Sequence, residues 1–283
     1  MKRLLLSVAI GLGAVASTSA MAATPAFSAQ KVAQVKLPDL SFKQVMRAFY
    51  NGQMTRVFVN DEDIESLPYI GLGYGEDGEQ TVAVMHPIVG YLNSTGEPRY
   101  LVIIEKLKIY EDSRSLVSGH AMGADADLYT FKRLKTGQYQ LVSKSGPNLQ
   151  LSGSWGRIQL DASSLKTGLQ PIGKNLVGSI FSNGYVSTGV VETWWEVLHL
   201  PEDDYINSYV LGDAGSSNGG NYEETSPLYY DYESTYQVIP DGNKYYPIKL
   251  TYKGERPTDD YERIESVNHS VIKKFNPVKK EYY

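Results

Sequence analysis

Residues 191–200, which read VETWWEVLHL, carry the side chains best suited to bind a ligand. Successive side chains of a β-strand point to opposite faces, so Glu192, Trp194 and Glu196 share one face and Trp195 belongs to the other, core-facing one. An indole ring between two carboxylates offers an apolar surface for stacking and polar groups for hydrogen bonding. We therefore predict that Trp194, Glu192 and Glu196 bind a ligand, with sugars as the natural class.

The two glutamates of this strand cannot act together on one glycosidic bond. Four residues of strand span about 13 Å, at roughly 3.3 Å per residue. Retaining glycosidases need carboxyl groups about 5 Å apart, and inverting ones up to about 9.5 Å apart. A hydrolase of cell-envelope polymers therefore needs Glu192 or Glu196 to pair with a carboxylate elsewhere, for which Asp203 and Asp204 are the candidates.

The segment SGHAMGADADLY, residues 118–129, offers one histidine and two aspartates between glycines. His120 has no second histidine or cysteine nearby, and Asp125 and Asp127 lack the D-x-[DN]-x-[DN]-G frame of a calcium loop. The glycines mark a turn, and a strand is expected to begin at Asp127. We interpret the segment as a loop that leads into a strand, with His120 as a hydrogen-bonded anchor.

A G-x-S-x-G motif at residues 215–219 resembles the nucleophile elbow of α/β-hydrolases. That elbow needs a helix directly after the serine, whereas Gly220 and Asn221 follow here. The motif therefore indicates a loop, and we predict no catalytic residue.

No metal site or cofactor is predicted. The four histidines, at positions 86, 120, 199 and 269, are scattered and form neither an H-E-x-x-H nor an H-x-H pair. Acidic clusters at residues 60–63 and 203–204 suit solvated turns. Calcium remains open, because it accepts loop carboxylates and carbonyls.

One helix is predicted near the start of the chain. Apolar residues at positions 42, 45, 46 and 49 line one face of a helix. Ser41 with Gln44 fits a capping box, and Asn51-Gly52 fits a stop signal.

After residue 55 the pattern is that of strands and turns. Turn pairs at Asp77-Gly78, Asn183-Gly184 and Asp241-Gly242 separate apolar segments. The expected strands cover residues 99–110, 127–134, 138–143, 176–182, 185–200, 228–239 and 244–253. Because no helical patterns intervene, we predict a mainly β fold, an antiparallel sandwich or barrel-like sheets with a partial propeller possible, and one N-terminal helix packed on a sheet.

Residues 1–22 have the charged start, apolar stretch and A-x-A site of a secretory signal peptide cleaved near Ala22. Residues 23–37 are predicted to be a flexible leader, and residues 38–283 a single β-rich domain that divides near 213–227 if it has two parts. No later apolar run is long enough to span a membrane. The protein is therefore expected in the periplasm or outside the cell.

Composition excludes several classes of protein. The chain has no cysteine, so disulfides, thiolate metal sites and cysteine nucleophiles are ruled out. Beyond residue 22 it carries 25 basic and 32 acidic residues, a net charge of 25 − 32 = −7, without a basic stripe. This balance argues against nucleic acid as a partner.

Residues 119–161 carry a set of short motifs. They are His120-Ala121, Leu128-Tyr129 with Phe131, the segment from Gly137 to Ser145, and Gly153-Ser154-Trp155-Gly156. This region resembles a group of secreted, β-rich proteins of proteobacteria, some of which have cysteines where Gly119 and Met122 stand here. The resemblance implies an exported β-rich protein and no particular activity.

The 22 tyrosines and the paired tryptophans favour a binding or interaction protein over an enzyme. We expect Tyr229 and Tyr230 to belong to the same contact surface as Trp194. Two kinds of partner remain open at this point: a protein, blocked in the manner of an inhibitor or immunity protein, or an envelope glycan.

Overall fold

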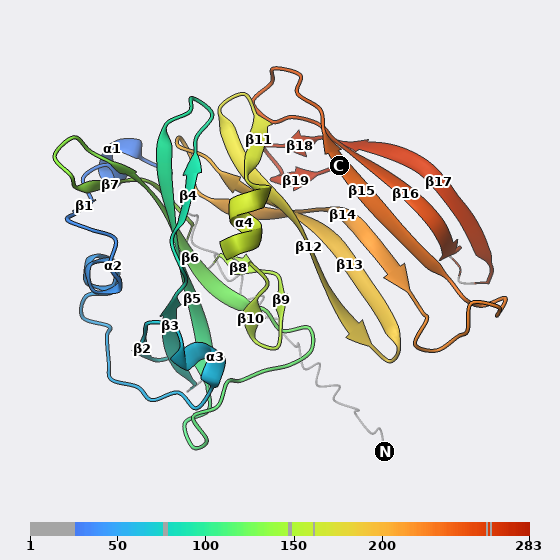
Figure 1. Cartoon of the computed structure of the whole chain (residues 1–283), viewed down its shortest axis with the longest axis horizontal. Coiled ribbons are helices and arrows are strands. Elements are labelled where there is room, and N and C mark those ends of the chain that lie inside the picture. Colours follow the sequence, from blue (N-terminus) through green and yellow to red (C-terminus); the bar gives the residue numbers. More distant parts are fainter. Residues whose placement is uncertain (1–25, 76–78, 147–148, 161, 259, 261) are drawn as a thin grey trace, which may run out of the picture.

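A computed structural model describes residues 26–75, 79–146, 149–160, 162–258, 260 and 262–283. The fold is mainly β and antiparallel, as the sequence predicts, and consists of two large sheets side by side (Figure 1). The predicted signal peptide and the Asp77-Gly78 turn lie outside the described residues.

The first sheet has the strand order β1-β7-β6-β5-β3-β2, with β4 beside β5 and β8 beside β6. Its strands are β1 Lys36–Leu37, β2 Tyr69–Tyr74, β3 Gln80–Met85, β4 Val89–Leu92, β5 Pro98–Ile109, β6 Ala124–Arg133, β7 Tyr139–Lys144 and β8 Gln150–Leu151. The long β5 runs through its centre and pairs with β3, β4 and β6.

The second sheet is a meander in which each strand pairs with the next along the chain. Its strands are β11 Gln170–Gly173, β12 Leu176–Ser187, β13 Val190–Leu200, β14 Asn207–Ser217, β15 Asp231–Val238, β16 Ile248–Pro257 and β17 Ile264–Lys273. The sheet curves into a half-barrel, and the C-terminal hairpin β18 Phe275–Asn276 and β19 Glu281–Tyr282 contributes Phe275 and Tyr282 to its apolar core (Figure 1).

The predicted helix is α2, Phe42–Phe49. Val45 and Met46 are buried against Val102 and Ile104 of β5, so the helix packs on the first sheet as expected. The capping box does not form, because Ser41 makes no side-chain hydrogen bond to the helix.

Short helices and strands not predicted from the sequence complete the fold. The helices are α1 Ala29–Val32, α3 Glu62–Glu65 and α4 Ala162–Gly168, and a two-stranded hairpin consists of β9 Gly153–Ser154 and β10 Arg157–Ile158. Because α4 contacts both β4 and β12, it lies between the sheets. Among the described residues, no helix has the length and apolarity that a membrane crossing requires.

The prediction of a flexible leader over residues 23–37 is wrong for its described part. Val32 of α1 and Leu37 of β1 are buried in the core beside α2, and β1 pairs with β7. The polar composition hid this, because Val32 and Leu37 are the residues of the segment's described part that are buried.

The hairpin turn predicted at Asn183-Gly184 is also wrong. The strand β12 continues through this pair, and the turn falls at Thr188-Gly189, where both residues have positive φ angles of 48° and 78°. Asn183 is buried within the strand and hydrogen-bonds to Glu196, which gives it a role other than turn formation.

The change from one sheet to the other occurs between β10 and β11, across α4. Residues 213–217 belong to β14, and residues 218–230 connect β14 to β15 within the second sheet. The expected boundary between two sub-domains near 213–227 therefore lies inside a continuous sheet, and its first residues belong to the bulged strand β14.

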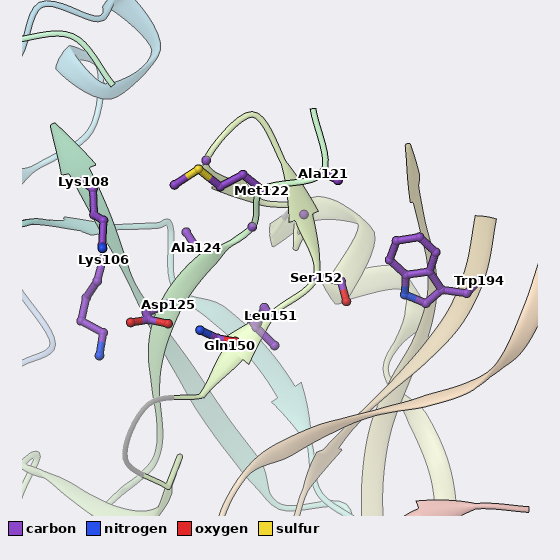
Figure 2. Close-up of a pocket in the computed structure, with 13 residues that line it drawn as sticks. Lys106, Lys108, Ala121, Met122, Ala124, Asp125, Gln150, Leu151, Ser152 and Trp194 are labelled. Atoms are coloured by element: carbon purple, nitrogen blue, oxygen red, sulfur yellow. The ribbon is translucent and has the colours of Figure 1, made fainter. Parts of the chain in front are cut away.

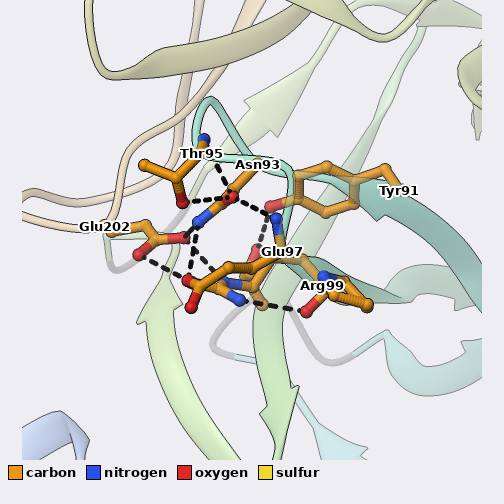
Figure 3. Close-up of polar contacts among 8 residues, drawn as sticks. Tyr91, Asn93, Thr95, Glu97, Arg99 and Glu202 are labelled. Atoms are coloured by element: carbon orange, nitrogen blue, oxygen red, sulfur yellow. Dashed lines mark hydrogen bonds and ion pairs between the residues drawn. The ribbon is translucent and has the colours of Figure 1, made fainter.

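The two sheets share an apolar core and a polar junction. Leu101, Ile103 and Leu128 of the first sheet lie in one cluster with Leu198 and Leu200 of β13. At the junction, Arg99 of β5 donates hydrogen bonds to Glu202 and Glu97, and Asn93 donates to Glu202 (Figure 3). These contacts fix the position of β13 relative to the first sheet.

Candidate functional site

Two clefts meet at Trp194, which lines both of them. The first has a volume of about 510 Å³ and extends from Trp194 past Ser152 and Gln150 to Lys106 and Lys108 (Figure 2). The second has a volume of about 410 Å³ and lies over the ends of β13 to β16. Both volumes fall within the roughly 300–1,000 Å³ range of ligand sites.

The register of β13 places the Trp194 ring. Trp194 lies opposite Asn183 of β12 and Asp213 of β14. The pairing of β13 with β14 shifts on both sides of the Trp194–Trp195 pair, and such bulges change the direction in which a side chain points. The edge of the Trp194 ring packs on Tyr185, with 6.2 Å between ring centroids.

Glu192 lies beside Trp194 in the second cleft. Its carboxylate accepts a hydrogen bond from the Tyr185 hydroxyl, and this contact raises the pKa of Tyr185. Tyr185 therefore orients both the indole ring and the carboxylate.

Glu196 does not reach either cleft. It shares a face with Trp194, as strand alternation predicts, but it is 3% exposed and accepts a hydrogen bond of 2.6 Å from Asn183 Nδ2. Further along this face of β13, Leu198 packs in the apolar core between the sheets. Burial of the side chains therefore increases from Glu192 toward Leu198. We correct the assignment of Glu196 from a ligand-binding residue to a buried residue behind Trp194.

The two predicted tyrosines differ in position. Tyr230 lines the second cleft, and its backbone N–H donates to Asn218 Oδ1 at 2.9 Å. Tyr229 is not among the residues that line this cleft, and its hydroxyl donates to Asp231 at 3.3 Å. Three of the five predicted residues, Trp194, Glu192 and Tyr230, thus line one cleft.

Sequence reasoning missed several residues of the second cleft, above all Asp213, Tyr232 and Arg256. Burial, followed by the nearby Asp213 carboxylate, raises the pKa of Tyr232 to about 12. Asp213 lies in the segment expected to be a loop. The period-two pattern of β14 continues through the glycines. This continuation is the signal that could have placed Asp213 opposite Trp194.

The polar groups of the first cleft include two lysines that have acidic partners. Lys106 pairs with Asp127 at 3.2 Å, and Lys108 pairs with Glu79 at 3.1 Å. Asp125, which the sequence placed in a loop, is the second residue of β6 and lines this cleft. The cleft therefore combines paired charges with the amide of Gln150 and the hydroxyl of Ser152.

His120 lies in the loop before β6, as expected. Its ring packs on Trp155 with 4.1 Å between centroids. The other sequence candidates lie apart from the clefts. Asp203 pairs with Lys244 at 2.9 Å, and Asp204 caps the Tyr205 N–H.

Asp203 and Asp204 follow the far end of β13, about 26 Å or more along the strand from Glu192 at roughly 3.3 Å per residue. Ser217 of the G-x-S-x-G motif is the last residue of β14, and a turn rather than a helix follows it. Within the described residues, no group of three or more histidine or acidic side chains is placed to hold a metal ion.

Comparison of the chain with protein-family models, curated proteins and solved structures gives no match.

Proposed function

We propose that this protein is an exported binding protein for a cell-envelope glycan, with Trp194 as its central contact. The observation that carries the proposal is the position of Trp194 between two polar clefts. A sugar ring stacks its C–H face on an indole and places its hydroxyl groups toward polar side chains on either side. Glu192 and Asp213 can accept hydrogen bonds from hydroxyl groups, and Arg256 can donate them.

The shape of the site favours a glycan over a folded protein as the partner. Protein interfaces are built around a broad patch with an apolar, well-packed centre. Here the aromatic ring lies between two concave surfaces, one lined by polar and apolar side chains together and the other by charged side chains and tyrosines. A chain-like ligand can occupy both concave surfaces at once.

Location in the periplasm or outside the cell is part of the proposal. It is supported by the signal-like residues 1–22. An envelope glycan is the polymer that such a protein meets in this compartment.

Retention of the purified protein by insoluble peptidoglycan and by other envelope polysaccharides tests the proposal. We expect wild-type protein to be retained and Trp194→Ala to be lost from the pellet. Tyr110→Ala is the control, because Tyr110 is an exposed aromatic residue that lines neither cleft. Equal retention of the two variants, or no retention of the wild type, would contradict the proposal.

A glycan hydrolase is the second candidate function, because Glu192 and Asp213 line one cleft from neighbouring strands. Diagonal neighbours on a sheet face lie roughly 7–8 Å apart. Side chains on such neighbouring positions can bring their carboxyl groups to the roughly 6.5–9.5 Å that an inverting pair needs.

Release of reducing sugar ends from peptidoglycan distinguishes the two functions. Hydrolysis by the wild type that is lost in both Glu192→Gln and Asp213→Asn would favour the enzyme. Binding without release of reducing ends favours the binding protein.

A further inference from the structure

Trp155 stands at an exposed turn in a backbone conformation that few side chains adopt. The turn joins β9 to β10, and its two central residues, Trp155 and Gly156, have φ angles of 58° and 74°. Two positive φ angles define a type I′ turn, in which asparagine, aspartate and glycine are preferred. Tryptophan at this position is conformationally costly, and 52% of its surface is exposed, so burial does not explain it.

Neighbouring segments fix the turn and the ring. The Trp155 N–H donates to the Gly119 carbonyl at 2.9 Å, and the Gly156 N–H donates to the Met122 carbonyl at 2.7 Å. The His120 ring packs against the indole. The ring is therefore ordered before any ligand arrives, which lowers the entropy cost of binding.

The hairpin that carries Trp155 is also fixed to the first sheet. Glu105 of β5 is fully buried and accepts hydrogen bonds from Arg157 Nε at 3.0 Å and from the Ile158 N–H at 2.7 Å. Burial of Glu105 raises its pKa, but the contacts with His86 and Arg157 outweigh it, so that the pKa is lowered and the carboxyl stays ionised.

Trp155 does not itself line the first cleft, but it adjoins residues that do. Its neighbour Gly156 lines that cleft, as do Ala121 and Met122 of the loop that carries His120. Trp194 lines the same cleft from the second sheet (Figure 2). The cleft thus extends between an aromatic ring of one sheet and the turn that presents a second aromatic ring.

We propose that Trp155 is a second stacking site, and that the ligand is an extended oligosaccharide bound at Trp194 and Trp155 together. The inference rests on the proposed glycan-binding function and adds the length of the ligand. A β-1,4-linked chain of N-acetylglucosamine units suits it, because equatorial linkages keep successive rings extended with their C–H faces exposed. The costly conformation of Trp155 is explained if its ring serves binding rather than folding.

Affinity for chito-oligosaccharides of increasing length tests this inference by calorimetry. We expect wild-type protein to bind the hexasaccharide more tightly than the disaccharide. Trp155→Asn should lower hexasaccharide affinity about tenfold and leave disaccharide affinity unchanged, because one stacking contact is lost. Trp155→Phe keeps a ring and should retain most of the hexasaccharide affinity.

Stability supplies the second readout. Trp155→Asn should raise the melting temperature, since asparagine adopts the left-handed conformation more readily. Thr188→Asn is the matched control, because Thr188 holds the equivalent position, with φ 48°, in the turn between β12 and β13. It should also raise the melting temperature, but without any change in hexasaccharide affinity.

The outcomes separate this inference from the proposed function. If both ligands bind and Trp155→Asn lowers neither affinity, the second stacking site is wrong and the Trp194 site stands. If Trp155→Asn lowers the melting temperature, the ring serves the fold and the inference is wrong. If peptidoglycan and every oligosaccharide fail to bind the wild type, both proposals fall.

Discussion

Arg99 of β5 donates from Nε to Glu202 Oε1 at 2.6 Å, and this ion pair joins the first sheet to the segment that follows β13 (Figure 3). Arg99 is 4% exposed, and its Nη2 also donates to Glu202 Oε2 at 3.1 Å. Because β13 carries Trp194, the pair helps to position the proposed binding site relative to the first sheet.

We predict that Arg99→Met lowers the free energy of unfolding by about 2 kcal/mol, because it removes the charge-assisted hydrogen bonds of a buried guanidinium to two exposed carboxylates. Arg256→Met is the control, since the Arg256–Glu265 pair is exposed on both sides. Exposed pairs contribute less than about 1 kcal/mol. Denaturant unfolding measures both variants, and equal losses would contradict the importance of the junction.

Acid should destabilise the protein through His199. Burial lowers the pKa of this histidine to about 3, while its Nε2 lies 2.8 Å from the Tyr282 hydroxyl of the C-terminal hairpin. The unfolded chain takes up a proton near pH 6.5 and the folded one does not, so the stability present above about pH 6.5 declines as pH falls toward about 3. The contribution is about 2 kcal/mol between pH 7.5 and pH 5.

His199→Gln should remove this part of the pH dependence while keeping a polar side chain beside Tyr282. Urea unfolding at the two pH values measures it, and His269→Gln, at an exposed position, serves as the control. A variant at His199 that loses as much stability on acidification as the wild type would rule out this residue as the source.

A third prediction concerns the buried hydrogen bond between Asn183 and Glu196. In the described part of the chain, Asn183 is the side chain that donates to the buried Glu196 carboxylate. Asn183→Leu should cost about 3 kcal/mol of unfolding free energy, since it leaves a buried carboxylate without its donor. The double variant Asn183→Leu/Glu196→Leu should recover much of that loss.

A double-mutant cycle measured by denaturant unfolding checks this coupling. Simple additivity of the two single variants would mean that the Asn183–Glu196 contact contributes nothing to the fold.

Local sequence patterns predicted those helices and turns whose conformation depends on residues close together in the sequence. The helix α2 follows from four apolar residues on one face, and Gly242 of the predicted Asp241-Gly242 turn has a positive φ of 81°. The prediction of a turn at Asn183-Gly184 is wrong because Asn183 instead hydrogen-bonds to Glu196, 13 residues away in the sequence. Long-range pairing of this kind leaves no local signal.

The candidate site was likewise predicted only in part. Alternation along β13 placed Glu192 and Trp194 on one face, and the cleft contains both. Alternation could not tell that Glu196, on the same face, is buried, because burial depends on long-range packing that the alternation does not encode. The predicted site did not include Trp155, although a Trp-Gly pair is an unusual choice of residues for a tight turn.

The indole N–H signals of the protein test the central claim most directly. The chain has three tryptophans, and each gives one signal in a ¹H–¹⁵N spectrum. Trp195 is the internal reference, because its Nε1 donates to Ser234 at 2.9 Å within the half-barrel. On titration with the hexasaccharide, we predict that the Trp194 and Trp155 signals shift and saturate together while the Trp195 signal stays in place. A Trp194 signal that does not move with any envelope glycan would contradict the account.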